Sequence, residues 1–92
     1  MKVYFIGSGP GDPELLTIKA KKIIEKADIV IYAGSLISKD IIKLAKKDAR
    51  LYDSSGMNLG EVLQVIRRAK PAEKIIARIH SGDPSIYGAI QE

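Results

Sequence analysis

The sequence predicts an open α/β domain with a mostly parallel sheet and helices on both faces of that sheet. The strand-like runs are apolar throughout and do not alternate with polar residues, as expected of strands buried on both faces. Stretches with apolar residues at helical spacing lie between these runs. No internal repeat, linker or low-complexity segment interrupts the pattern, which is that of a single domain.

The first strand is predicted at residues 3–6 and is ended by the glycine-rich segment 7–11. The helix that follows has two possible starts. Asp12 before Pro13 has the layout of an N-cap and a first helical residue, whereas Thr17 is suited to cap a helix that begins later. With either start, one apolar face is formed by Leu16, Ala20, Ile23, Ile24 and Ala27.

The middle of the chain predicts two more strands, at 29–32 and 51–52, with a helix between them. Ser38 is expected to cap that helix, and a loop is expected at 53–56. Asn58 and Glu61 resemble a capping box at the start of the next helix, which Pro71 should end. The apolar positions of these two helices are Ile41, Ile42, Leu44 and Ala45 in the first, and Leu59, Val62, Leu63 and Ile66 in the second.

The fourth strand is predicted at 75–80, and Asp83 before Pro84 favours a final helix. Residues 86–92 allow fewer than two turns of that helix and include no glycine or proline near residue 92 to stop it. We therefore expect a sheet of four strands that lacks a further strand.

Composition excludes several classes of protein. The 46% hydrophobic and 28% charged residues among 92 are typical of a folded chain and not of a disordered one. The absence of cysteine excludes disulfides and thiolate chemistry, and a single histidine excludes a multi-histidine metal site. No apolar run approaches the ~20 residues of a membrane span, so no membrane partner and a cytoplasmic location are expected.

The net charge of +4 has two interpretations, nucleic-acid binding or solvated helix faces. The lysines fall mainly on the predicted helices, and the chain has only four tyrosines and one phenylalanine to stack on bases. The solvated faces are the simpler explanation, and no nucleic-acid partner is expected.

The glycine-rich and polar segments 7–11, 33–35, 53–55 and 80–83 each follow a predicted strand. Open α/β sheets bind ligands beyond the carboxyl ends of their strands, so this arrangement predicts a small-molecule site. A dinucleotide fingerprint is excluded, because Asp12 stands where the third glycine is needed and Pro10 lacks an amide N–H. Simple turn and capping roles remain open for the first loop, for the loop 53–55 and for Asp83.

Three segments together resemble the tetrapyrrole methylases, the S-adenosylmethionine-dependent enzymes of cobalamin and sirohaem synthesis. They are GSGPGDPELLT (residues 7–17), YAGSL (32–36) and HSGDPSIYGA (80–89). The second and third are most similar to those of the methylases that act on carbon 11 of cobalt-precorrin-4 or precorrin-4.

The resemblance implies a two-domain protein with S-adenosylmethionine held in the cleft between the domains. Residues 1–92 correspond to its N-terminal α/β domain, without the last strand of that domain and without the second domain. The implied cofactor contacts are Pro10, Ser81, Gly82, Asp83 and Ile86. The residues implied to face the tetrapyrrole cleft are Gly7, Gly9, Gly11 and Asp12.

The function implied by the resemblance is methyl transfer to carbon 11 of a (cobalt-)precorrin-4 in cobalamin biosynthesis, by a homodimer, with no catalytic residue identified. The alternatives are a sister methylase of other position specificity, or a non-enzymatic ligand-binding or oligomerisation module. Because half the cleft would be missing, we expect residues 1–92 alone to be inactive and to bind the cofactor weakly. We also expect them to associate with the missing half or with a second copy through an exposed sheet edge.

Overall fold

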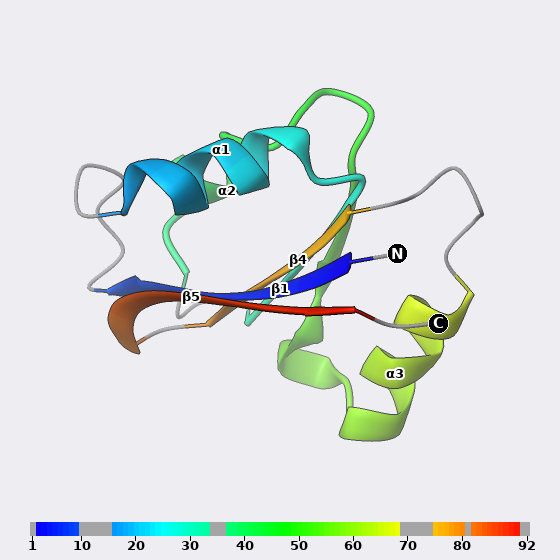
Figure 1. Cartoon of the computed structure of the whole chain (residues 1–92). Helices are drawn as coiled ribbons and strands as arrows, with labels where there is room; N and C mark the ends of the chain where they lie inside the picture. Colours follow the sequence, from blue (N-terminus) through cyan, green and yellow to red (C-terminus); the bar gives the residue numbers. More distant parts are fainter. Residues whose placement is uncertain (1, 10–15, 34–36, 69–74, 81, 91–92) are drawn as a thin grey trace.

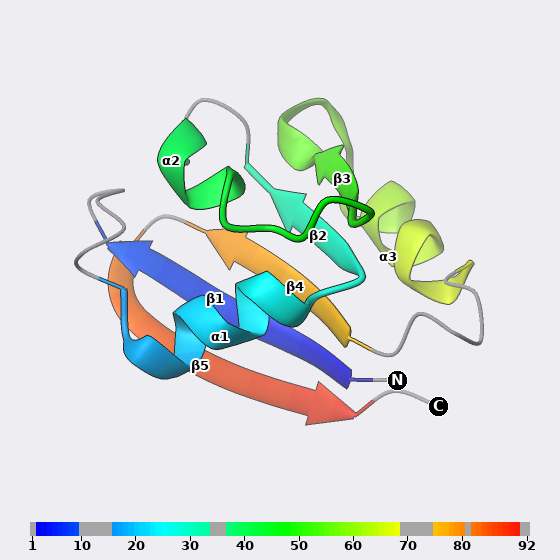
Figure 2. The same ribbon diagram turned by 90° about the horizontal axis from the view of Figure 1, so that it is seen from above.

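The computed structural model describes residues 2–9, 16–33, 37–68, 75–80 and 82–90. They form one five-stranded sheet in the order β3-β2-β4-β1-β5 (Figures 1 and 2). The elements are β1 (Lys2–Gly9), α1 (Ile18–Lys26), β2 (Ile29–Tyr32), α2 (Lys39–Ile42), β3 (Arg50–Asp53), the 3-10 turn η3 (Ser54–Gly56), α3 (Leu59–Arg67), β4 (Ile75–His80) and β5 (Gly82–Ile90). Strands β1 to β4 run parallel, and β5 pairs antiparallel with β1.

Helices cover both faces of the sheet, as the sequence predicts. Helices α1 and α2 lie on one face and α3 lies on the other (Figure 1). Successive residues of β2 therefore enter different cores, with Val30 on the side of α1 and α2, and Ile29 and Ile31 on the side of α3. The buried residues of the first core are Ile6, Leu16, Ala20, Ile24, Ala27, Val30, Ile37, Ile41, Ala77 and Ile79. Those of the second core are Val3, Ile29, Ile31, Val62 and Ile76.

Thr17 is the N-cap of α1. Its side-chain Oγ1 accepts a hydrogen bond from the backbone N–H of Ala20 at 3.0 Å, which satisfies one of the free amides of the first turn. The later of the two predicted helix starts is therefore confirmed. Residues 12–15, on which the earlier start depends, lie outside the described part of the chain.

The capping predictions for α2 and α3 are also confirmed. Ser38 Oγ accepts from the N–H of Asp40 at 3.2 Å, although regular helix extends only over Lys39–Ile42. At α3, Asn58 Oδ1 accepts from the N–H of Glu61 at 2.9 Å, and Glu61 Oε1 accepts from the N–H of Asn58 at 3.4 Å. These two bonds form the reciprocal capping box. Within the described ranges, no helix has the length and apolar character needed to cross a membrane.

The prediction of a final helix at Asp83 and Pro84, and with it the prediction of a four-stranded sheet, is wrong. Residues Gly82–Ile90 form β5, which pairs with β1 from Gly9↔Gly82 to Lys2↔Ile90. A helix of fewer than two turns makes few internal hydrogen bonds, whereas the edge of β1 offers a full row of backbone partners. Pro84 lies where the register shifts, on an edge strand, which is a place that tolerates its missing N–H.

Asp28 joins three strands at the amino edge of the sheet. Its backbone N–H donates to the carbonyl of Ile75 at 2.9 Å, and its carbonyl accepts from the N–H of Arg50 at 2.9 Å. Its carboxylate accepts from the N–H of Ile75 at 3.0 Å and contacts Lys46 Nζ at 2.6 Å. Asp28 therefore holds the starts of β2, β3 and β4 at one level, and this sets the level at which the same strands end.

Candidate ligand site at the carboxyl edge of the sheet

The four parallel strands end side by side. Gly7 of β1 lies opposite His80 of β4, and Tyr32 of β2 lies opposite Ile79 of β4 and Asp53 of β3. The predicted convergence of the loop-bearing strand ends on one edge of the sheet is thus confirmed (Figure 2). This carboxyl edge is the place where open α/β sheets bind small molecules.

Strand β5 begins at the same edge. Gly82 lies opposite Gly9, and the register shifts between Gly7 and Gly9. The first and last glycine-bearing motifs, more than seventy residues apart in sequence, are therefore adjacent in space. Glycines on both strands leave the backbone of each accessible to a close approach, because neither carries a Cβ atom.

The structure brings together some of the predicted site residues and not others. Gly7, Gly9, Gly82 and Asp83 are at or next to the carboxyl edge. Ile86 pairs with Ile6 and so lies further down the sheet. Four predicted site residues fall outside the described part of the chain: Pro10, Gly11, Asp12 and Ser81. The assigned contacts of all these residues remain predictions.

The loop after β3 has a clear structural role. Asp53 Oδ1 accepts from the N–H of Ser55 at 2.9 Å and from its hydroxyl at 2.7 Å. Ser54 Oγ donates to the carbonyl of Tyr32 at 3.1 Å, which ties the η3 turn to the end of β2. These hydrogen bonds give Asp53, Ser54 and Ser55 a turn-forming role, which the sequence analysis left open for this loop.

The described residues of this edge offer polar groups that could bind a small molecule. His80 is exposed here opposite Gly7 of β1, and Asp53 is exposed at the end of β3, which β2 and β4 separate from β1. Among the described residues, no group of three or more His, Cys, Asp or Glu side chains is placed to hold a metal ion. The arrangement suits a polar small molecule held by backbone groups of the strand ends.

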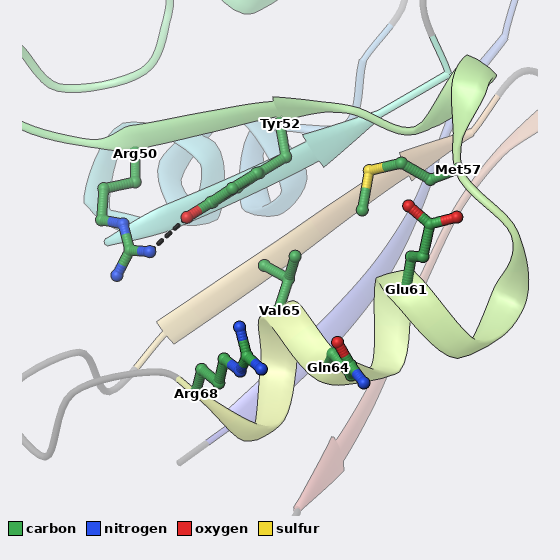
Figure 3. Close-up of a pocket in the computed structure, with 7 residues that line it drawn as sticks. All are labelled: Arg50, Tyr52, Met57, Glu61, Gln64, Val65 and Arg68. Atoms are coloured by element: carbon green, nitrogen blue, oxygen red, sulfur yellow. Dashed lines mark hydrogen bonds between the residues drawn. The ribbon is translucent and has the colours of Figure 1, made fainter.

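A separate hollow of about 280 Å³ lies between β3 and α3 (Figure 3). Its apolar lining comes from Tyr52, Met57 and Val65. Its polar lining comes from Arg50, Glu61, Gln64 and Arg68. The Arg50 guanidinium donates to the Tyr52 hydroxyl and lies 5.4 Å from the centre of that ring.

The sequence analysis did not identify this hollow. Arg50 and Tyr52 are two apart on a strand, and Glu61, Gln64 and Arg68 are three and four apart along a helix, so each set shares a face. That signal was available in the sequence. It is the same signal that any solvated strand or helix surface gives, so the pairing of the two faces becomes visible only in the fold.

The sequence matches known proteins over its whole length. Residues 2–92 match the model of the tetrapyrrole (corrin/porphyrin) methylases. The cobalt-precorrin-4 C(11)-methyltransferase of Methanocaldococcus jannaschii is 54% identical over 91 residues, which are 99% of this chain and 35% of that protein.

Solved structures show the same relationship. A cobalt precorrin-4 methyltransferase, a cobalamin biosynthetic enzyme, superposes with a TM-score of 0.82 at 41% identity, over 89% of this chain and 34% of that one. A uroporphyrin-III C-methyltransferase of Thermus thermophilus, solved with S-adenosylhomocysteine, superposes with a TM-score of 0.66 at 35% identity. The match covers 89% of this chain and 33% of that one.

The chain spans about a third of the length of these relatives. Within that third, the chain is similar to the relatives both in overall sequence and in fold. With the family model matched across residues 2–92, the chain belongs to the tetrapyrrole (corrin/porphyrin) methylase family.

Proposed function

We propose that the protein containing this chain transfers a methyl group from S-adenosylmethionine to carbon 11 of cobalt-precorrin-4, or of precorrin-4, in cobalamin biosynthesis. The observation that supports this most strongly is the 54% identity, over nearly the entire chain, to a relative named for that activity. The lower identity of 40% to a uroporphyrinogen-III methylase of Bacillus subtilis makes a sister specificity the second candidate.

Residues 1–92 form, in this proposal, the N-terminal domain of a two-domain cytoplasmic homodimer. The additional length of the relatives supports a second domain that completes the cleft. The carboxyl edge of the sheet, with its glycine-bearing strand ends, would be one wall of that cleft.

The residues at the carboxyl edge fit S-adenosylmethionine as the methyl donor. The donor carries a positive sulfonium and an ammonium group, and this edge holds Asp53 and Asp83 with no lysine or arginine in the strand ends themselves. The facing glycines 9 and 82 leave room for a ligand close to the backbone. In this proposal the cofactor contacts are Pro10, Ser81, Gly82, Asp83 and Ile86, and the substrate-facing residues are Gly7, Gly9, Gly11 and Asp12.

The bound donor would supply an electrophilic methyl group to a carbon nucleophile. Such a displacement gains most from holding donor and acceptor in line and from excluding water, and it does not require a dedicated base. The residues of this chain would then serve to bind and orient. The hydrogen bonds of Asp28 fix the starts of β2, β3 and β4 relative to one another at the opposite edge of the sheet. The carboxyl ends of these strands are thereby held in fixed positions, which suits that task.

The proposal is tested by offering the full-length protein S-adenosylmethionine with a radiolabelled methyl group and three separate acceptors. These are cobalt-precorrin-4, precorrin-4 and uroporphyrinogen III. Label on either precorrin and not on uroporphyrinogen III supports the assigned position. Label on uroporphyrinogen III alone would establish the sister specificity, and binding of the donor without transfer to any acceptor would favour a non-enzymatic module.

A further inference from the structure

We propose that Ser54 is a positioning residue for the methyl transfer proposed above. Its hydroxyl joins the 3-10 turn η3 to the end of β2, and so fixes where Tyr32 and Ala33 emerge at the ligand edge. The inference rests on the proposed function, because it gives a role in that reaction to a residue that the resemblance does not place among the site residues.

The Ser54 hydroxyl extends the contact between β2 and β3 past the last pair of the ladder. The two strands pair from Ile29↔Arg50 to Tyr32↔Asp53, so regular pairing ends at Tyr32. Ser54 directly follows Asp53, and its Oγ donates to the carbonyl oxygen of Tyr32 at 3.1 Å in a partly buried position. A backbone carbonyl at a strand end needs a hydrogen-bond partner, and here a side chain supplies one. Because each strand has only four residues, this bond adds directly to the few that hold the end of β2 against β3.

Ser54 is itself held in place by its turn. The N–H of Met57 donates to the Ser54 carbonyl at 3.0 Å, and the Met57 side chain packs against the second core. Next to Ser54 in the same turn, Asp53 Oδ1 accepts from both the N–H and the hydroxyl of Ser55. The Ser54 hydroxyl therefore reaches Tyr32 from a fixed backbone, which makes its hydrogen bond a constraint on the position of β2.

The position of the β2 end matters because β2 lies between β3 and β4 (Figure 2). Tyr32 pairs with Ile79 of β4, two residues before the predicted cofactor contacts begin at Ser81. The Tyr32 side chain packs, partly buried, against the first core. Tyr32 is thus held by β4 on one side and by Ser54 on the other. Loss of the Ser54 bond would let the end of β2 move relative to the neighbouring cofactor segment.

Such a movement should affect the rate of transfer more than the binding of the donor. The donor contacts implied by the resemblance lie on or next to β1, β4 and β5, and none lies on β2 or η3. The transfer step depends on the alignment of donor and acceptor, and a misplacement of about 1 Å costs a factor of about 100 in rate. Ser54 should therefore act on kcat through Tyr32, without itself contacting donor or acceptor.

The chain offers a matched control in the same turn. Ser54→Ala and Ser55→Ala each remove one hydroxyl from η3, but the exposed Ser55 hydroxyl donates to Asp53 within the turn. The Ser55 N–H keeps its own 2.9 Å bond to Asp53 when the hydroxyl is removed. Ser54→Thr retains a hydroxyl oxygen at the same position and serves as the rescuing variant.

The experiment measures kcat of the full-length proteins with saturating S-adenosylmethionine and whichever tetrapyrrole the wild type methylates. Calorimetry gives the dissociation constant of S-adenosylhomocysteine, and thermal unfolding gives the melting temperature. For Ser54→Ala we expect kcat lowered at least about tenfold and a dissociation constant within about twofold of wild type. Its melting temperature should be close to that of Ser55→Ala. Ser54→Thr and Ser55→Ala should both keep a kcat near that of wild type.

Equal kcat values in Ser54→Ala and Ser55→Ala would overturn the positioning role, and so would a Ser54→Thr variant as slow as Ser54→Ala. A Ser54→Ala protein that loses melting temperature and affinity for S-adenosylhomocysteine in parallel with kcat would also overturn it, because general loss of structure would then explain the rate. These three outcomes are seen with an active wild type and leave the proposed function intact. A wild type that methylates no tetrapyrrole would instead overturn the proposed function, and the positioning role with it.

Discussion

The carboxylate of Asp28 forms an ion pair with Lys46, with 2.6 Å between Oδ1 and Nζ, at the amino edge of the sheet. The second carboxylate oxygen accepts the N–H of Ile75 at 3.0 Å. The pair therefore joins the segment before β3 to the starts of β2 and β4. Because these strands are parallel, fixing their starts also fixes the level at which Tyr32, Asp53 and His80 emerge at the ligand edge.

Replacing Asp28 should cost more stability than replacing its partner. Asp28→Ala leaves the Ile75 N–H without its acceptor and should lower the free energy of unfolding by about 1–3 kcal/mol. Lys46→Met removes only a partly exposed ammonium and should cost less. Urea unfolding of the two variants measures both values, and an equal or larger loss in Lys46→Met would contradict the role given to Asp28.

The same pair predicts a dependence of stability on alkaline pH. The hydrogen bond to Asp28, and then the charges of Asp28 and Asp48, raise the pKa of Lys46 above its ordinary 10.5, although partial desolvation acts in the opposite direction. The folded state thus holds this proton more tightly than the unfolded state does. The stabilisation that the charged Lys46 gives to the folded state is fully present below pH 10.5. It is lost as the pH rises through the raised pKa of Lys46.

We therefore expect the difference in the free energy of unfolding between wild type and Lys46→Met to be constant below pH 10.5. This difference should shrink as the pH rises through the raised pKa of Lys46. Paired denaturant titrations at increasing alkaline pH measure the difference and cancel the titration of other groups. A difference that widens with rising pH would show that the Lys46 pKa is not raised.

The cap of α1 predicts a third outcome. Thr17→Ala removes the acceptor of the Ala20 N–H and should lower the free energy of unfolding by about 1 kcal/mol. Thr17→Ser keeps a hydroxyl oxygen at the same position and serves as the matched control. Thermal unfolding that does not distinguish alanine from serine would show that the cap contributes no stability.

The fourth prediction concerns Asp83. If its charge serves the cationic methyl donor, Asp83→Asn should weaken binding of S-adenosylmethionine to the full-length protein at least about tenfold. The melting temperature should change little, because asparagine has nearly the same size. Calorimetric titration that finds equal affinity in both proteins would remove Asp83 from the cofactor site.

Much of the fold follows from local sequence signals. Strands β2 and β4 have the predicted bounds because each is a short apolar run between turn residues. The capping box of Asn58 and Glu61 is likewise a local pattern with a local outcome. Strand β1 continues to Gly9 because the glycines remain in the ladder, which the sequence alone did not indicate.

The misassigned end of the chain shows where local signals fail. Asp83 and Pro84 have the layout of a helix start, but the edge of β1, distant in sequence, pairs with this segment as a strand. For the candidate site, the parallel arrangement made the shared edge predictable. The hollow between Arg50 and Arg68 was not predictable, because it depends on how β3 and α3 lie against each other.

The most direct test of the central claim is the position of the transferred carbon. Full-length protein is incubated with cobalt-precorrin-4 and S-adenosylmethionine carrying a ¹³C-labelled methyl group, and the product is examined by NMR. The account predicts a single new methyl resonance, coupled to carbon 11 of the macrocycle. Label at a different ring carbon, or no labelled tetrapyrrole at all, would contradict it.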